Sequence, residues 1–259
     1  MAIFLLVVCV CFGAVSFAIV GVSLVNHLVR PGVSSGHNDV LAAIFQAGGT
    51  IYAVFLAFLV VAVWQAHDAA HANIADEASQ LCTLYRGSEA MDPGAGEKLR
   101  VLIRQYTQAV ITDEWKVQAR SGGASETARA AGLHMFKVFG ETSPGVRQNE
   151  QAIDTVQLGI IAQLQADRNK RTLQSQESIS PVIWSAAIIN GFIVVSMSFL
   201  LYADRPWPHI VMSGALAAMI SALLCVVFIL ERPLGGLMPL QPDAFAHSLQ
   251  VYDSVDRTG

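Results

Sequence analysis

The chain has 259 residues, of which 53% are hydrophobic and only 14% are charged, whereas soluble domains carry about 25% charged residues. The charges are concentrated between positions 65 and 181, which hold 12 of the 16 Lys and Arg and 14 of the 20 Asp and Glu. The net charge of −4 gives no argument for nucleic-acid binding, so we expect no nucleic-acid partner. The flanking segments are almost free of charge, which is typical of segments embedded in membrane lipid.

Two apolar runs before position 65 are long enough to cross a bilayer, which takes about 20 helical residues. The first covers residues 3–25 without a charge. Because no Lys or Arg precedes it and it exceeds the length of a signal-peptide core, we expect a retained span rather than a cleaved signal. The second covers about 40–64, and Asn38 or Asp39 could cap its start.

Two further apolar runs follow the charged region, at about 182–202 and 210–230. The first of these begins after Ser180-Pro181, which is an N-cap followed by proline at the first helical position. The second ends before Glu231. Aromatic rings that prefer the membrane interface lie at the predicted span ends, at Trp64, Trp184, Tyr202 and Trp207.

Four spans place the N-terminus, the middle region and the tail on one side of the membrane. Basic residues near that side are Arg168, Lys170, Arg171 and Arg232, against Arg30 and Arg205 on the other side. The positive-inside rule therefore predicts a multi-pass membrane protein with the middle region and both termini in the cytoplasm.

The middle region shows apolar residues at helical spacing in three stripes, which are Ala78, Leu81, Cys82 and Tyr85, then Leu99, Leu102, Ile103, Tyr106 and Val110, then Ile153, Val156, Ile160 and Leu164. Helix starts are expected at Asp92-Pro93 and Ser143-Pro144, and a break at 120–125. We expect the second span to continue as a long helix, two or three more helices to follow, and the last to lead directly into the third span. The tail after Pro233 is rich in Gly and Pro and is expected to be irregular.

The predicted fold is therefore an all-α membrane protein, with four transmembrane helices and a helical cytoplasmic domain inserted between the second and third. Residues 1–64 hold the first two spans, 65–181 the cytoplasmic domain, 182–230 the last two spans and 231–259 a cytoplasmic tail. Membrane lipid is the expected surrounding partner.

His67 and His71 are four residues apart, so they share a helix face and could bind zinc. The metalloprotease form of this motif has Glu after the first His, and here the residue is Asp68. The sequence identifies no third ligand, so a polar juxtamembrane turn is the simpler interpretation and no metal site is predicted. No hydrolase elbow, P-loop or dinucleotide fingerprint is present, so we expect neither an enzyme nor a cofactor.

Small residues recur every fourth position in two spans, at Gly49, Ala53 and Ala57 and at Gly214, Ala218 and Ala222. Such stripes let helix backbones approach closely, either within the chain or between subunits. Another side of the second span carries Ile51, Phe55, Phe58 and Ala62. In an oligomer this face could line a narrow apolar pore, and in a monomer it would face lipid or another helix.

The span centres contain no Asp, Glu, Lys, Arg or His, which argues against ion-coupled transporters and proton pumps. Asn190 is polar and mid-span, so it should find a hydrogen-bond partner in a neighbouring helix. Glu231 follows the fourth span, where a carboxylate meets the negative end of the helix dipole. Arg232 or a basic residue of the middle region could offset that charge, or Glu231 could be exposed to solvent.

Several motifs resemble the bacterial bestrophin-like domain family in order and spacing from about Asp39 to Phe245. They are GTIYAVFLAFLVVAVW at 49–64, EASQLCTLYR at 77–86, Tyr106, Glu114-Trp115, PVIW at 181–184, ERPLGG at 231–236 and QPDAF at 241–245. One departure is Gln65, where the family often has an acidic residue. No acidic run resembles the calcium clasp of animal bestrophins, so calcium gating is not carried over.

This resemblance implies a homo-oligomer related to anion channels with four spans per subunit and an aromatic neck on the second span. The leading hypothesis is a homo-oligomeric channel of the bacterial inner membrane that conducts anions and is lined by Ile51, Phe55, Phe58 and Ala62. A non-conducting scaffold or sensor that recruits a cytoplasmic partner is the alternative. A zinc enzyme built on His67 and His71 is the third and weakest hypothesis.

Overall fold

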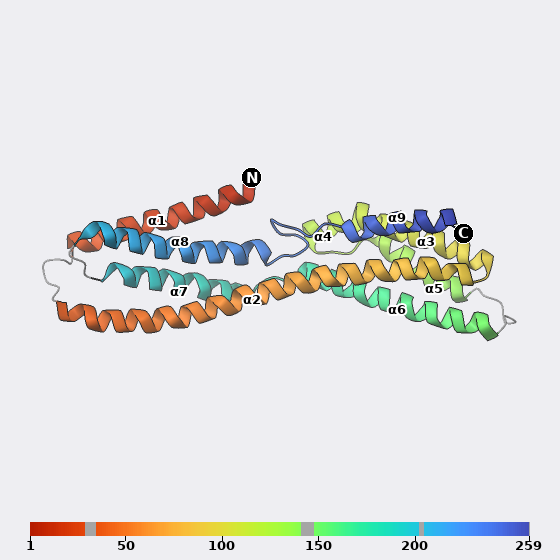
Figure 1. Ribbon diagram of the computed structural model, residues 1–259, viewed down its shortest axis with the longest axis horizontal. Helices are drawn as coiled ribbons and strands as arrows, with labels where there is room; N and C mark the ends of the chain where they lie inside the picture. The colour runs from red at the N-terminus through yellow and green to blue at the C-terminus, as the bar shows by residue number, and fades with distance from the viewer. Residues whose placement is uncertain (29–34, 141–147, 202–204, 259) are drawn as a thin grey trace. The chain divides into compact units, whose positions relative to one another are not determined.

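The computed structural model describes residues 1–28, 35–140, 148–201 and 205–258, and within these ranges the regular structure is helical (Figure 1). Four helices are long and apolar enough to cross a membrane, as the hydropathy pattern predicted. They are α1 (Ala2–Leu28), α2 (Ser35–Gly87), α7 (Pro181–Phe199) and α8 (Pro206–Leu230). Predicted span residue Tyr202 lies outside the described ranges.

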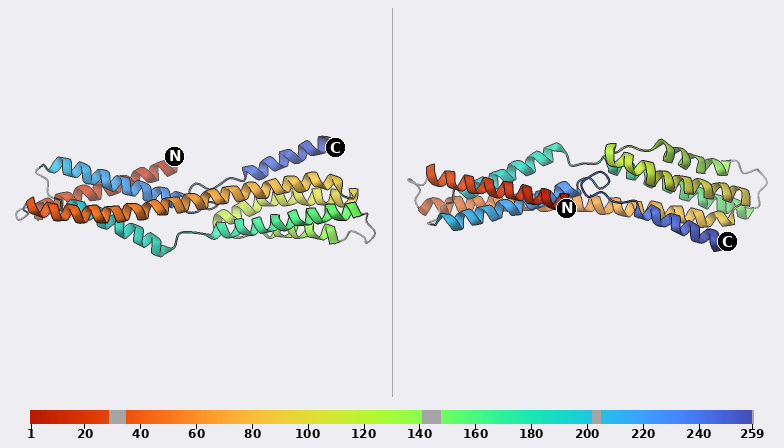
Figure 2. Two further views of the ribbon diagram at one scale, coloured as in Figure 1. Left: turned by 60° about the horizontal axis from the view of Figure 1, so that its bottom comes forward. Right: turned by 90° about the horizontal axis from the view of Figure 1, so that it is seen from above.

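The chain divides into two compact units, and α2 contributes to both. Unit 1 comprises Met1–Gln65 and Ser178–Glu231. In it α1 packs along α8, as both views of Figure 2 show. Four α2 side chains on one helix face enter the unit 1 core, at Tyr52, Leu56, Leu59 and Val63. The apolar α2 residues before Gln65 therefore present one face to their own chain and leave others uncovered.

Unit 2 comprises Ala66–Glu177 and Arg232–Gly259. It contains the second part of α2, then the 3-10 turn η2 (Ser88–Ala90), α3 (Pro93–Ala109), the π-helical turn η3 (Val110–Glu114), α4 (Trp115–Ser121), α5 (Glu126–Gly140), α6 (Gln148–Gln176) and α9 (Asp243–Thr258). Its core is formed by the predicted stripes of α2 and α3 together with apolar residues of α4, α5, α6 and α9. Which unit lies in a membrane and which in the cytoplasm stays a prediction.

Several local predictions are confirmed. α2 is one continuous helix of 53 residues. The Asp92 carboxylate accepts hydrogen bonds from the Gly94 and Ala95 amides, and Ser180 Oγ accepts from the Val182 amide, so both are N-caps followed by proline. The expected break after Arg120 is present, since α4 ends at Ser121 and α5 begins at Glu126. Ser143-Pro144 lies outside the described residues.

Other local predictions were wrong. α6 does not lead directly into α7, because residues 177–180 separate them and the position before Pro181 disfavours helical backbone. The tail is irregular only as far as Pro242 and then forms α9, where buried Phe245, Ser248 and Tyr252 recur at helical spacing. α2 begins at Ser35, so Asn38 and Asp39 lie inside it and do not cap its start.

The third stripe was right at three positions and wrong at one, since Leu164 is buried and Ile153 and Ile160 pack against the unit 2 core. Val156 is exposed, whereas Gln157, Ile161 and Leu164 are buried. The face that α6 turns inward continues to Arg168 and Arg171. Because this inward face of α6 also carries polar and charged residues, a pattern of apolar residues alone does not identify all of it.

Candidate functional site

The uncovered side of α2 in unit 1 carries three of the four residues predicted to line a pore. Ile51 is 72% exposed and Phe58 is 71% exposed, and Ala62 is also exposed. Phe55 is half-buried and packs against the unit 1 core. Helical spacing puts Val54 and Val61, both about half exposed, on the side opposite the buried stripe, with Phe58 beside them. The most prominent exposed aromatic side chain of this face is therefore Phe58.

The two small-residue stripes have different surroundings. In α8, Gly214 is buried, and a Cβ at this position would lie 3.5 Å from Val15 Cγ1 of α1. The Ala218 carbonyl accepts a weak hydrogen bond from Cys11 Sγ, and Ala222 is half-buried on the same helix. In α2, a Cβ at Gly49 would meet nothing within 4 Å, and Ala53 and Ala57 are exposed. The α8 stripe thus packs against α1, and the α2 stripe leaves room for another helix.

The polar residues at the spans have partners other than those expected. The Asn190 amide nitrogen donates at 2.8 Å to the Ala186 carbonyl, one turn earlier in the same helix, and not to a neighbouring helix. Asn190 lies on an exposed side of α7, where its own helix supplies the acceptor. The Trp184 indole N–H donates to Glu231 at 2.7 Å. Glu231 is thereby stabilised by a neutral donor within unit 1, and Arg232 does not pair with it among the described contacts.

His67 and His71 lie on α2, half-buried and exposed respectively. Among the residues that the structure describes, no group of three or more His, Cys, Asp or Glu could hold a metal ion. The pair therefore gains no third ligand within those ranges.

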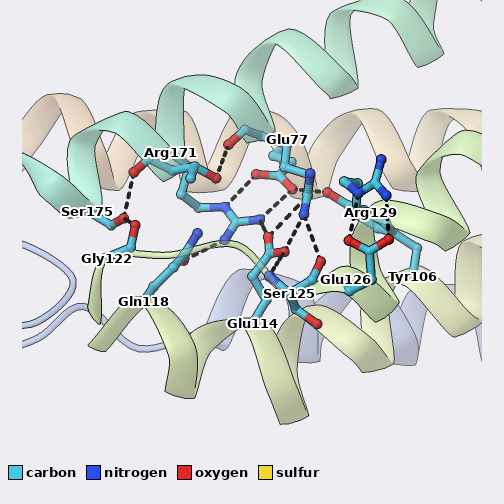
Figure 3. A network of polar contacts seen from close by, with 12 residues as sticks. Glu77, Tyr106, Glu114, Gln118, Gly122, Ser125, Glu126, Arg129, Arg171 and Ser175 are labelled. Atoms are coloured by element: carbon cyan, nitrogen blue, oxygen red, sulfur yellow. Dashed lines mark hydrogen bonds and ion pairs between the residues drawn. The ribbon is translucent and has the colours of Figure 1, made fainter. Parts of the chain in front are cut away.

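Unit 2 contains a buried network of charged side chains that joins several of its helices (Figure 3). Arg171 of α6 lies at its centre and is fully buried. Its guanidinium donates to Glu77 at 2.7 and 3.0 Å, to Glu114 at 2.9 Å and to the Gln118 side-chain oxygen at 2.7 Å. Arg168 donates to Glu114 at 2.5 and 3.2 Å. Two arginines face two glutamates, so the buried charge is balanced.

Neutral groups complete this network. Tyr106 donates its hydroxyl proton to Glu77 at 2.6 Å, and the Ser125 amide donates to Glu114 at 3.0 Å. The rings of Trp115 and Phe245 each lie 5.5 Å from the Arg171 guanidinium. Every carboxylate therefore has several donors, which is the condition under which buried charge is tolerated.

The network also sets protonation states. Burial alone would lower the pKa of Arg171, but the neighbouring carboxylate of Glu77 raises it, so the guanidinium stays charged. Burial, reinforced by the negative charge of Glu77, raises the pKa of Tyr106 well above its usual value, so its hydroxyl stays a donor. The cluster is closed to solvent and joins α2, η3 and α6 rather than exposing a reactive group.

The position of Glu114 depends on the π-helical turn at Val110–Glu114. A π-helical turn inserts an extra residue into a helix and changes which side chains face inward. Here Glu114 and Trp115 are both buried, and the Trp115 indole donates to the Leu240 carbonyl at 3.0 Å. The π-helical turn thus brings both the Glu114 carboxylate and the Trp115 ring into the buried network.

Sequence reasoning did not predict this network. Arg168 and Arg171 were counted as basic residues near a span end, yet the folded chain neutralises both. The sequence nevertheless contained a signal for this ion pair. Glu77 adjoins the apolar stripe of α2 at Ala78 and Leu81, and Arg171 continues the inward face of α6. Charged residues at core positions of two helices predict an ion pair between them.

The chain is similar to known proteins both in sequence and in fold. Residues 12–245 match the Bestrophin-like domain. Two crystal structures of a bacterial bestrophin homologue from Klebsiella pneumoniae, each with one substitution, share the fold: one has 12% identity and a TM-score of 0.70 over 96% of this chain and 98% of that one. The other has 12% identity and a TM-score of 0.71 over 98% and 99%.

A crystal structure described as a membrane protein is similar too, with 13% identity and a TM-score of 0.71 over 96% of this chain and 97% of that one. No curated protein matches the chain. The structural neighbours establish a shared fold, while the match over residues 12–245 covers most of the sequence. The chain belongs to the Bestrophin-like domain family.

Proposed function

We propose that this protein is a homo-oligomeric membrane channel that conducts anions through a pore lined by α2. The supporting observation is the uncovered apolar face of α2, on which Ile51 and Phe58 are among the most exposed large side chains of unit 1. Membership of the Bestrophin-like domain family adds support by analogy. The proposal includes a cytoplasmic location for unit 2 and for both termini.

The shape of the α2 surface favours contact with other copies. One face is already used by the unit 1 core through Tyr52, Leu56, Leu59 and Val63. The Gly49, Ala53 and Ala57 stripe leaves space at which a neighbouring helix could approach closely. If several copies form a ring and pack against one another through this stripe, the side of α2 that carries Phe58 would face the α2 helices of the other copies.

The preference for anions rests on analogy with the family. Residues 40–64 contain no Asp, Glu, Lys or Arg, so the α2 face carries no ring of charge of either sign and forms an apolar constriction in the proposed pore. A constriction of apolar side chains gates by excluding water, and its permeability depends strongly on side-chain size. Shortening an exposed aromatic residue should therefore raise conductance.

Phe58→Ala tests this proposal, with Phe12→Ala as a matched control. Phe12 is an equally exposed phenylalanine of unit 1, at 73%, but it lies on α1. Purified protein in planar bilayers should conduct, and Phe58→Ala should raise the single-channel conductance while Phe12→Ala leaves it unchanged. Equal effects of the two substitutions would place Phe58 against lipid. Silent bilayers with verified reconstitution would favour the non-conducting scaffold.

A further inference from the structure

A small polar cavity in unit 2 is formed by residues other than those of the proposed pore face. Its volume is about 230 Å³, and it is formed by the end of α4, the end of α6 and the chain after α8. Its lining includes Gln118, Arg120, Gly122, Glu177, Arg232 and Gly235. A water molecule occupies about 30 Å³ of liquid, so the cavity has room for a small molecule rather than a single water.

The backbone around the cavity is held by close contacts. Gly122 adopts a left-handed conformation with φ of 67°, and its carbonyl accepts hydrogen bonds from Ser175 Oγ and Gln176 Nε2, both at 2.9 Å. A Cβ at Gly235 would lie 3.0 Å from the Ala119 carbonyl oxygen. The end of α4 is therefore held to the end of α6 by the two hydrogen bonds to the Gly122 carbonyl. The chain after α8 packs directly against α4 at Gly235.

One donor in the cavity wall has no acceptor. The side-chain oxygen of Gln118 accepts from Arg171 at 2.7 Å (Figure 3). This contact fixes the orientation of the amide, because a flipped amide would point its N–H groups at the guanidinium. The Gln118 amide nitrogen is buried and makes no hydrogen bond within the described residues. A buried N–H group without a partner is costly, and an acceptor atom in the cavity would satisfy it.

The charged residues of the lining favour a negatively charged ligand. They are Arg120, Arg232 and Glu177, which together carry a net charge of +1. All three side chains belong to exposed residues, and no ion pair of the described chain holds either arginine. Guanidinium groups bind carboxylate and phosphate oxygens through paired hydrogen bonds.

From the cavity, the unpartnered Gln118 donor and the two arginines, we propose that unit 2 binds a small oxyanion, with a carboxylate or phosphate group as its recognised part. Arg120 and Arg232 bind the oxyanion, and the Gln118 amide donates to one of its oxygens. This site is separate from the α2 face and does not depend on whether the protein conducts ions.

The test is calorimetric titration of the purified full chain in detergent with inorganic phosphate and with succinate, at matched ionic strength and with sodium chloride as the reference. Saturable binding of phosphate or succinate is expected, and comparison of the two shows which oxyanion is preferred. Arg120→Gln and Arg232→Gln should each weaken binding by about tenfold, as expected for loss of a charge-assisted contact. Lys116→Gln is the matched control, because Lys116 is an exposed cation of α4 that does not line the cavity.

A third variant, Gln118→Glu, keeps an oxygen for Arg171 and replaces the donor with a negative charge, so it should abolish binding. Its melting temperature shows whether it is folded, and the two arginine variants decide the question if it is not. The proposal is overturned if neither oxyanion binds. It is also overturned if Lys116→Gln weakens binding as much as the arginine variants, since that result indicates general charge attraction.

Discussion

Arg171 and Glu77 form a two-point ion pair inside unit 2, with Nε and Nη2 of the arginine donating to the two carboxylate oxygens at 2.7 and 3.0 Å. Both side chains are fully buried. The pair joins α6 to α2 across 94 residues of sequence. A buried ion pair adds little net stability compared with apolar packing, yet removing one partner is costly because the other charge stays buried.

Arg171→Met is therefore expected to destabilise unit 2 strongly. The substitution leaves Glu77 and Glu114 buried with fewer donors, which should cost about 3–5 kcal/mol of unfolding free energy. Urea unfolding of the detergent-solubilised protein, followed by circular dichroism, measures the change. Arg129→Gln is the control, because Arg129 forms an exposed pair with Glu126 three residues away and such pairs add little. Similar losses in both variants would contradict the central role of Arg171.

Tyr106→Phe should reduce stability at neutral pH and alter its dependence on alkaline pH. The hydroxyl donates to Glu77 at 2.6 Å, and its loss should cost about 1–3 kcal/mol. Burial, and next the charge of Glu77, raises the pKa of Tyr106 well above its usual 10.0. Above pH 10 the unfolded chain therefore binds fewer protons than the folded one, and the free energy of unfolding falls as pH rises.

The variant lacks this proton, so its alkaline slope should be shallower by up to about 1.4 kcal/mol per pH unit. Urea unfolding at several pH values between 9 and about 11.5 measures both slopes. Identical slopes in the two proteins would show that Tyr106 does not keep its proton in the folded state.

Tyr252→Ala should release α9 from unit 2. The buried Tyr252 ring stacks on Tyr85 at a centroid distance of 4.3 Å, and its hydroxyl lies 3.1 Å from that of Thr107. Loss of a buried aromatic side chain costs about 3–5 kcal/mol. Hydrogen exchange by mass spectrometry should show faster exchange in residues 243–258. Tyr252→Phe keeps the ring and should retain most of the protection; equal exchange in the two variants would contradict a role for the stack.

Trp184→Phe should destabilise unit 1, because Glu231 would lose the indole donor at 2.7 Å. A hydrogen bond to a charged group contributes about 1.5–3 kcal/mol, and Glu231 also faces the negative end of the α8 dipole. The melting temperature in detergent should fall for Trp184→Phe and remain unchanged for Trp64→Phe, since Trp64 is exposed. An unchanged melting temperature for both would show that the Glu231 contact adds nothing.

The sequence predicted features that depend on neighbouring residues. Hydropathy located four helices of membrane-spanning length, and Asp92 and Ser180 marked helix starts because capping uses residues only two or three positions away. Apolar spacing also identified the inward faces of α2 and α3 in unit 2. These signals are local, so one sequence is enough to read them.

Long-range contacts could not be read in the same way. Arg171 meets Glu77, Glu114 and Gln118 from 53 to 94 residues away, and no local pattern specifies those pairs. The π-helical turn at η3 changes the helical phase before Glu114, so periodicity continued from α3 fails there. α9 was missed because Gly and Pro before it dominated the composition, although Phe245 and Tyr252 are spaced for one helix face.

The most direct test of the proposed channel is the current across planar bilayers that contain the purified protein under a potassium chloride gradient. Discrete channel openings are expected, with a reversal potential close to the chloride equilibrium potential. A reversal potential near that of potassium would contradict anion conduction, and the absence of current at verified protein incorporation would contradict the channel itself.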